Sequence, residues 1–175
     1  MKVDRAQLAD VCKRYGAFLV GLPAEIQGGV LLWAIAGNES SFGQNLAPRH
    51  EPEYCPQLGW HKYLSPDAKD AYALRPGRYA NDPRQPDLHR EFGCLACCSF
   101  TPWQIMAVHA IGYSPLELLN DLERGAEALV GFLNRKIAST QPESLKDIAV
   151  IWNGGGVSQQ YIEQLQKNYA AGFPA

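Results

Sequence analysis

The sequence predicts a mainly α-helical protein of one domain, residues 1–175, with an irregular inserted lobe at residues 44–98. Apolar residues recur at helical spacing on both sides of this lobe, and cap signals mark where the later helices begin. Residues 44–98 lack that spacing and hold seven of the 12 prolines and four of the five cysteines. Because a structureless loop of that length is rare within a compact domain, we expect the lobe to fold onto the helical body.

The composition is that of an ordinary globular protein. Of the 175 residues, 46% are apolar and 19% are charged, which excludes wholesale disorder and allows a core without disulfides or metals. A net charge of −2 provides no general footprint for nucleic acid, and the longest apolar run, residues 30–36, is too short to cross a membrane. We expect a monomer with no nucleic-acid partner and no membrane span.

Two helices are predicted before the lobe. The first follows apolar residues from Val3 to Leu19 and is closed by Gly21 and Pro23. The second runs from about residue 24 to residue 38. Because its later turns are apolar nearly all round, we expect it to be the buried central helix, with Trp33 in the core.

The segments after the lobe are also predicted to be helical. Thr101-Pro102 is interpreted as a helix start, with a helix over residues 103–110. Ser114-Pro115-Leu116-Glu117 has the pattern of a capping box. Helices are then expected over residues 122–137, 144–152 and 158–171, the last two separated by Asn153-Gly154-Gly155-Gly156.

The cysteines leave alternatives open. Cys94 and Cys97 have the spacing of half a zinc site, which would need completion from Cys55, Cys98, His61 or His89. No second Cys pair is present, so buried thiols or one disulfide are favoured, with Cys12 standing alone. We expect no metal and no cofactor.

Glu39 is the first candidate for chemistry, because it ends the strongly apolar helix and precedes the polar turn Ser40-Ser41-Phe42-Gly43. Desolvation disfavours the charged form of a carboxyl, and a protonated carboxyl can act as a general acid. On this feature alone, a glutamate that caps a turn in solvent is the more common case.

Three segments together resemble the ordered motifs of the lysozyme-like superfamily, which includes soluble lytic transglycosylases, goose-type lysozymes and phage endolysin muramidases. The segments are Glu39-Ser40-Ser41-Phe42, Gln104-Ile105-Met106 and Trp152-Asn153-Gly154-Gly155. The stretch from Ile111 to Leu119 is similar to the link between the second and third motifs. The resemblance implies a lysozyme-like helical domain in which Glu39 is the catalytic acid.

The chain departs from the family pattern at four positions. Thr101, Pro102 and Trp103 stand where the family has Gly, Leu and Met. Trp152 replaces a tyrosine whose phenol points at the catalytic glutamate in the family. Since indole has a donor but no hydroxyl, any hydrogen bond to Glu39 must be arranged differently.

The resemblance implies cleavage of the β-1,4 bond between N-acetylmuramic acid and N-acetylglucosamine, with Glu39 as general acid and then base. A hydrolase normally needs a second carboxylate, whereas a lytic transglycosylase uses the C6 hydroxyl of the sugar and leaves a 1,6-anhydro product. Candidates are Glu51, Glu53, Asp67 and Asp70.

Glu51 is favoured as the second catalytic residue, because Arg49-His50-Glu51-Pro52 resembles an R-F-E-P segment of some endolysin muramidases. Positive charge on Arg49 and His50 would keep Glu51 ionised. We therefore favour hydrolysis, with the carboxyls of Glu39 and Glu51 roughly 6.5–9.5 Å apart. The alternatives are that Glu51 pairs with Arg49 or faces water.

The expected partner is the glycan strand of peptidoglycan. Gln104 and Asn153 would hydrogen-bond its acetamido groups or the backbone near the scissile bond. Trp103 and Trp152 would wall the groove, and Ser40 completes the predicted substrate-binding set. His109 is expected to be structural.

The first ten residues contain no signal peptide. The expectation is a protein made in the cytoplasm that acts on the cell wall, through phage lysis, on a virion or after injection, or else a trimmed secreted protein. The competing prediction is a glycan-binding or virion structural module that kept the helical body and lost catalysis, supported by the altered residues 101–103 and Trp152. A third is a zinc-stabilised lobe that contacts a partner.

Overall fold

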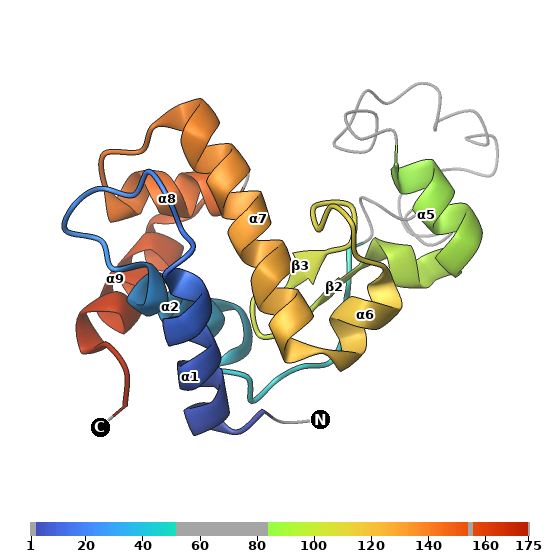
Figure 1. Cartoon of the computed structure of the whole chain (residues 1–175), viewed down its shortest axis with the longest axis horizontal. Coiled ribbons are helices and arrows are strands. Elements are labelled where there is room, and N and C mark those ends of the chain that lie inside the picture. Colours follow the sequence, from blue (N-terminus) through green and yellow to red (C-terminus); the bar gives the residue numbers. More distant parts are fainter. Residues whose placement is uncertain (1–2, 52–83, 154–155, 175) are drawn as a thin grey trace.

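The computed structural model describes residues 3–51, 84–153 and 156–174, and this part of the chain is mainly helical, as predicted. Its helices are α1 (Arg5–Gly16), α2 (Gly28–Ser40), α5 (Gln85–Phe92), α6 (Pro115–Asn120), α7 (Leu122–Thr140), α8 (Leu145–Trp152) and α9 (Gln159–Ala171). The long helix α7 runs through the middle of the molecule, with α1, α2, α8 and α9 on one side and a small sheet with α5 and α6 on the other (Figure 1).

The first two helices cross at very close range. Gly16 ends α1, and a Cβ there would lie 2.1 Å from the backbone nitrogen of Gly29 in α2. Only glycine permits such an approach of two backbones. Helix α2 begins at Gly28, about four residues later than predicted, because Pro23 and Ile26 close a turn in which the Ile26 N–H donates to the Pro23 carbonyl.

Helix α2 is the buried central helix that the sequence predicts. Each residue from Leu31 to Ala36 is buried, and Trp33 is only 3% exposed. Trp33 packs against Phe42 and Phe173, at ring-centroid distances of 4.6 and 5.7 Å. It therefore belongs to the core, as expected.

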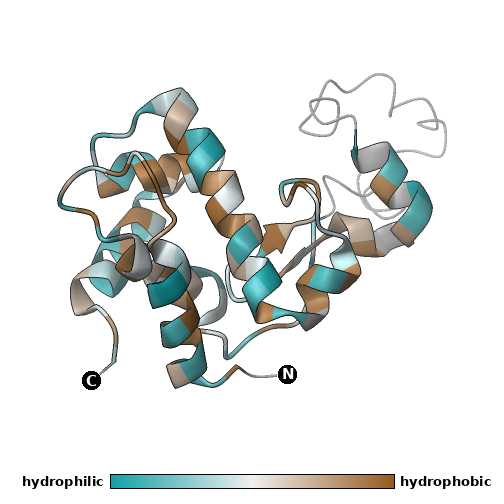
Figure 2. Cartoon of the chain, viewed as in Figure 1, coloured by the Kyte–Doolittle hydropathy of each residue, from teal (hydrophilic) through white to brown (hydrophobic). Residues whose placement is uncertain are grey.

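The cap signals of the later helices are confirmed. Ser114 and Glu117 form a complete capping box at α6, and the hydroxyls of Ser144 and Ser158 cap α8 and α9. Hydrophobic and hydrophilic residues alternate along α7 (Figure 2), whose apolar face is buried from Gly125 to Ile137. Local signals were sufficient here because each cap involves residues within one turn of the helix.

The sheet joins both ends of the predicted lobe. Its strands β1 (Arg49–His50), β2 (Cys98–Phe100) and β3 (Ile105–Met106) are antiparallel in the order β1-β2-β3. Arg49 is opposite Ser99, so the start and the end of the lobe lie side by side. Between them, α5 leads into the 3-10 helix η3 (Gly93–Cys97). Helix α5 was not predicted, because eight residues are too few to establish a helical period.

The predicted helix over residues 103–110 is wrong. Residues 101–104 form a tight turn between β2 and β3, with φ of 69° at Thr101 and 51° at Gln104. Thr101 Oγ1 does accept from the Trp103 N–H at 3.3 Å, as a cap would. The chain continues as a strand because Phe100, Trp103 and Ile105 are all buried by tertiary packing, which overrides the local signal.

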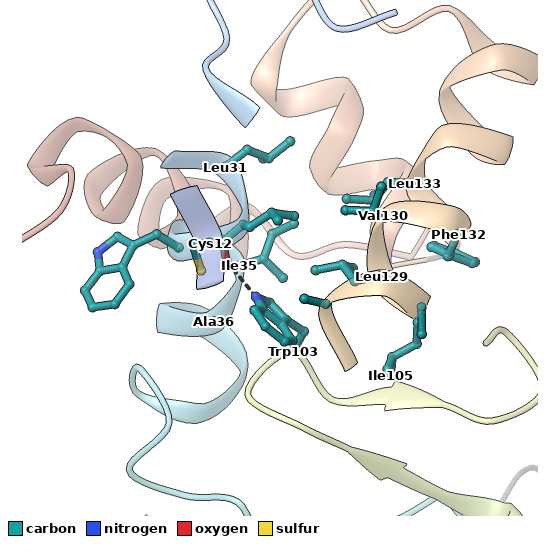
Figure 3. Packing of buried hydrophobic residues seen from close by; sticks show 14 of the residues in the cluster. Cys12, Leu31, Ile35, Ala36, Trp103, Ile105, Leu129, Val130, Phe132 and Leu133 are labelled. Atoms are coloured by element: carbon teal, nitrogen blue, oxygen red, sulfur yellow. Dashed lines mark hydrogen bonds between the residues drawn. The ribbon is translucent and has the colours of Figure 1, made fainter. Parts of the chain in front are cut away.

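Trp103 fastens this turn to the helices. It is fully buried, and its indole Nε1 donates to the Leu32 carbonyl of α2 at 2.8 Å (Figure 3). On the other side, Gly125 of α7 makes room for Thr101, since a Cβ at Gly125 would lie 2.5 Å from Thr101 Cγ2. The sheet is thereby held against both α2 and α7.

Among the described helices, none has the combination of length and apolar character needed to cross a membrane.

Candidate active site

Glu39 lies in the last turn of α2, partly buried, immediately before a strained reversal of the chain. Ser41, Phe42 and Gly43 have φ of 52°, 58° and 76°. The left-handed conformation costs about 1–2 kcal/mol for each non-glycine residue. The reversal is held by the Ser40 hydroxyl, which donates to the Ala36 carbonyl at 3.0 Å and accepts from the Gly43 N–H at 2.9 Å.

Two donors from different helices converge on one oxygen of Glu39. The indole Nε1 of Trp152 lies 2.8 Å from Oε1, and the hydroxyl of Tyr161 lies 2.7 Å from the same oxygen. A carboxylate oxygen has two lone-pair positions, so both positions of Oε1 are used. No donor among the described residues reaches Oε2.

Trp152 is oriented by its neighbour on α7. Its ring meets Phe132 edge to face, with centroids 5.6 Å apart and an interplanar angle of 84°. Asn153 is the C-cap of α8, and its backbone N–H and its Nδ2 both donate to the Ala149 carbonyl, at 3.1 and 3.3 Å. Trp152 thus contacts Glu39 from a helix end that Asn153 caps.

Tyr161 is the site residue to which the sequence assigned no role. Burial and the negative charge of Glu39 raise the pKa of the Tyr161 hydroxyl, while side-chain hydrogen bonds with Asn153 and Asn38 act in the opposite direction. The phenol consequently remains a donor at neutral pH. The available signal was a tyrosine in the first turn of the helix that follows the Trp152-Asn153 motif.

Glu51 follows β1, on a different element from Glu39. Its N–H donates to the Cys97 carbonyl at 2.9 Å. Its Oε1 accepts from Arg49 Nε at 2.7 Å and lies 3.0 Å from the Ser99 hydroxyl, and the side chain is 25% exposed. The ion pair with Arg49, one of the alternatives left open by the sequence, is present.

Gln104 and Glu51 are alternative acceptors for the single hydroxyl proton of Ser99. The Ser99 hydroxyl lies 3.1 Å from Gln104 Oε1, and Gln104 Nε2 donates to the Thr101 carbonyl at 3.0 Å. Gln104 is 9% exposed and Ser99 1%. The second motif therefore contributes a buried polar link within the sheet.

The structure contradicts direct glycan contact for two residues of the predicted binding set. Ser40 is 2% exposed and its hydroxyl is used by the turn after Glu39. Trp103 is 0% exposed and its indole N–H is used by the Leu32 carbonyl. Neither offers a free face or donor to a ligand, because the packing of α2 and the sheet encloses them.

No group of three or more His, Cys, Asp or Glu side chains in the described part of the chain is arranged to hold a metal ion. Cys12, Cys97 and Cys98 are buried, and burial raises the pKa of the Cys12 thiol. Several candidates lie outside the described residues: Glu53, Cys55, His61, Asp67, Asp70, Gly154, Gly155, and the side chains of His50, His89 and Cys94.

Comparison with known proteins yields no match to this chain among family models, curated proteins or solved structures.

Proposed function

We propose that this protein is a peptidoglycan-cleaving glycosidase of the lysozyme-like kind, with Glu39 as general acid and then base. Its bond would be the β-1,4 linkage between N-acetylmuramic acid and N-acetylglucosamine. The observation that carries the proposal is the pair of donors, Trp152 and Tyr161, on Glu39 Oε1. The order of the three motifs along the chain supports it.

The two donors suit the chemistry of a general acid. With Oε1 occupied, the proton on Oε2 is the one delivered to the leaving oxygen of the glycan. Transfer leaves a carboxylate whose charge is met by donors already in place, and preorganised donors of this kind stabilise charge that develops in the transition state. In the transglycosylase route the same carboxylate then accepts the proton of the attacking C6 hydroxyl, whereas in the hydrolytic route Glu51 accepts the proton of the attacking water.

Glu51 is proposed as the second carboxylate of a hydrolase. The Arg49 guanidinium and the Ser99 hydroxyl both lie at its Oε1, which fixes the orientation of the group. In the hydrolytic route Glu51 would activate a water on the opposite face of the sugar. In the transglycosylase route it has no such role, and the C6 hydroxyl of the sugar attacks instead.

Three residues are proposed to shape the glycan site. Trp152 would contribute to its wall and Asn153 would hydrogen-bond the glycan near the scissile bond. Gln104 would act through the link to Ser99 and Glu51, with its amide otherwise engaged by Thr101. The place of action would be the bacterial cell wall.

The test compares wild type, Glu39→Gln, Glu51→Gln and the control Glu25→Gln, an exposed glutamate on the loop before α2. Wall turbidity reports cleavage, and mass spectrometry of the muropeptides reports the product ends. We expect Glu39→Gln to lower the rate by roughly 10²–10⁴-fold, the usual contribution of general acid–base catalysis, and Glu25→Gln to clear walls like wild type.

The outcomes separate the alternatives. Walls left intact by wild type, or cleared equally by Glu39→Gln, would refute the enzyme. Anhydro-muramyl ends from wild type, or undiminished hydrolysis by Glu51→Gln, would refute the hydrolytic route and favour a lytic transglycosylase.

A second candidate function is a glycan-binding or structural module without catalysis. It is favoured by the burial of Ser40 and Trp103, two motif positions that serve packing. This alternative expects that the protein is pulled down by isolated walls while no reducing or anhydro sugar is released.

A further inference from the structure

We propose that Asn168 is a positioning residue for the Glu39 site. It is the middle of a directed chain of side-chain amides, Gln164–Asn168–Asn38, that sets the orientation of Tyr161 against Glu39. The effect on the geometry around Glu39 can be tested without the proposed function, whereas the effect on catalysis rests on the proposed function.

The chain of amides has one direction throughout. Gln164 Nε2 donates to Asn168 Oδ1 at 2.9 Å, and Asn168 Nδ2 donates to Asn38 Oδ1 at 2.7 Å. Asn38 Nδ2 then donates to the Tyr161 carbonyl at 3.1 Å. Each amide has one donor end and one acceptor end, so the orientation of one determines the orientation of the next.

The chain of amides is connected to Glu39 in two ways. Asn38 and Glu39 are neighbours in the last turn of α2, and Tyr161 is held by both. Its carbonyl accepts from Asn38, and its hydroxyl donates to Glu39 Oε1 at 2.7 Å. A change in the Asn38 amide therefore moves the residue that donates to Glu39.

The helices are built to bring these groups together. Tyr161, Gln164 and Asn168 are three and seven residues apart, so they lie on one stripe of α9, which packs on α2. Gly37 makes space for the Asn168 side chain, since a Cβ at position 37 would lie 2.6 Å from Asn168 Nδ2.

Packing alone does not call for an amide at position 168. Asn168 is only 7% exposed, and a buried amide costs about 1–3 kcal/mol when left without partners. An apolar side chain of similar volume would fill the place without that cost. The polar group adds direction to the contact, which an apolar residue cannot supply.

The decisive variant is Asn168→Asp, which keeps the volume and the acceptor for Gln164 but removes the donor to Asn38. The carboxylate would face Asn38 Oδ1, so the Asn38 amide should turn over and release Tyr161. The matched control is Asn134→Asp on α7. Asn134 also has one acceptor and one donor in use, towards the Val20 N–H and the Phe18 carbonyl, at 3.0 and 2.9 Å.

The first readout does not need catalysis. It is the indole N–H resonance of Trp152 in the full-length protein, identified by its loss in Trp152→Phe. We expect Asn168→Asp to move this resonance, because Glu39 Oε1 loses the Tyr161 donor that it shares with Trp152, and Asn134→Asp to leave it in place. Gln164→Glu applies the same change at the exposed end of the chain, where folding is not at risk, and should move the resonance in the same direction.

The second readout is kinetic. We expect kcat to fall by roughly tenfold or more in Asn168→Asp, with KM little changed, since small misplacements of a catalytic group have effects of this size. In a Tyr161→Phe background the further loss from Asn168→Asp should shrink, because both changes act through one contact.

An unmoved Trp152 resonance in folded Asn168→Asp, or in Gln164→Glu if the first variant does not fold, would overturn the proposal. So would full additivity with Tyr161→Phe in the kinetics. Absence of wall cleavage by wild type would remove the proposed function alone, and the resonance would still decide the role of Asn168.

Discussion

Glu39 receives a phenol and an indole on the same oxygen, and the two come from separate helices, α8 and α9. The phenol is that of Tyr161 at the start of α9, and the indole is that of Trp152 at the end of α8. Since indole is only a donor, Trp152 can stabilise the charged carboxylate but cannot take up its proton. At the residue scale, Glu39 is therefore held by two donors of different chemistry on one oxygen.

The two hydrogen bonds to Glu39 predict the effect of removing Trp152 or Tyr161 as a donor. Trp152→Phe and Tyr161→Phe should each lower kcat by roughly tenfold or more, because a hydrogen bond to a charged group contributes about 1.5–3 kcal/mol. Steady-state rates of wall-fragment cleavage measure this.

Trp103→Phe is the control for these variants. This substitution also removes an indole hydrogen bond, but the bond is to the Leu32 carbonyl and not to Glu39. It should lower the midpoint of urea unfolding while kcat stays close to wild type. A similar loss of kcat in all three variants would show that general destabilisation, and not the contact with Glu39, is responsible.

At the scale of elements, the position of α2 depends on two close contacts that only glycine allows. Gly16 admits the backbone of Gly29 at the start of α2, and Gly37 admits Asn168 and Phe42 near its end. The helix that carries Glu39 is therefore fixed at both ends by helices α1 and α9. The sheet is attached separately. Trp103 donates a hydrogen bond to the Leu32 carbonyl of α2, and Thr101 packs against Gly125 of α7.

Two glycine substitutions test this arrangement. Gly16→Ala would bring a Cβ within 2.1 Å of Gly29 backbone, and we expect a loss of about 3 kcal/mol or more in the free energy of unfolding, since backbone atoms cannot move aside.

Gly131→Ala in α7 is the comparison, because the nearest atom is the flexible end of Arg135 at 3.4 Å. There we expect a gain of about 0.5–1 kcal/mol from the lower entropy of the unfolded chain. Urea unfolding of both variants gives the two free energies. Equal losses of stability in both variants would show that the cost of Gly16→Ala does not come from the close approach to the Gly29 backbone.

At the scale of the whole molecule, phenol–carboxylate contacts link α1 to the rest of the fold. The Tyr15 hydroxyl of α1 donates to Glu123 and Glu127 of α7, at 3.1 and 3.3 Å, and the Tyr113 hydroxyl donates to Glu127 at 2.8 Å. Burial and the two carboxylates raise the pKa of Tyr15 to about 12, and burial and Glu39 raise the pKa of Tyr161.

The raised pKa values of these tyrosines predict that the protein loses stability at alkaline pH. An unfolded tyrosine ionises near pH 10, whereas folded Tyr15 keeps its proton up to about pH 12. Between these values the unfolded state binds fewer protons, so the free energy of unfolding falls as the pH rises, and the contribution is fully present below pH ~10.

Urea unfolding between about pH 8 and pH 11 measures this slope. Tyr15→Phe should be less stable near neutral pH and should lose stability less steeply above pH ~10. An unchanged slope in that variant would place the alkaline sensitivity elsewhere.

Short-range signals in the sequence determined most of the helices. The serines at positions 114, 144 and 158 each cap a helix because the partner of the hydroxyl is within three residues. The all-apolar turns of α2 predicted its burial, because no orientation of that helix leaves a polar face for solvent. Those turns also pointed to Glu39 as the first carboxyl after them, but on that feature alone a glutamate capping a turn in solvent was the favoured interpretation.

Only the tertiary structure decided what surrounds Glu39 and how the Trp103 segment folds. Thr101-Pro102 has the local pattern of a helix start, but burial of Phe100, Trp103 and Ile105 makes it the turn of a hairpin. Tyr161 and Asn168 reach Glu39 and Asn38 across more than a hundred residues of chain. Such contacts depend on how α2 and α9 pack, and no local period or cap encodes that packing.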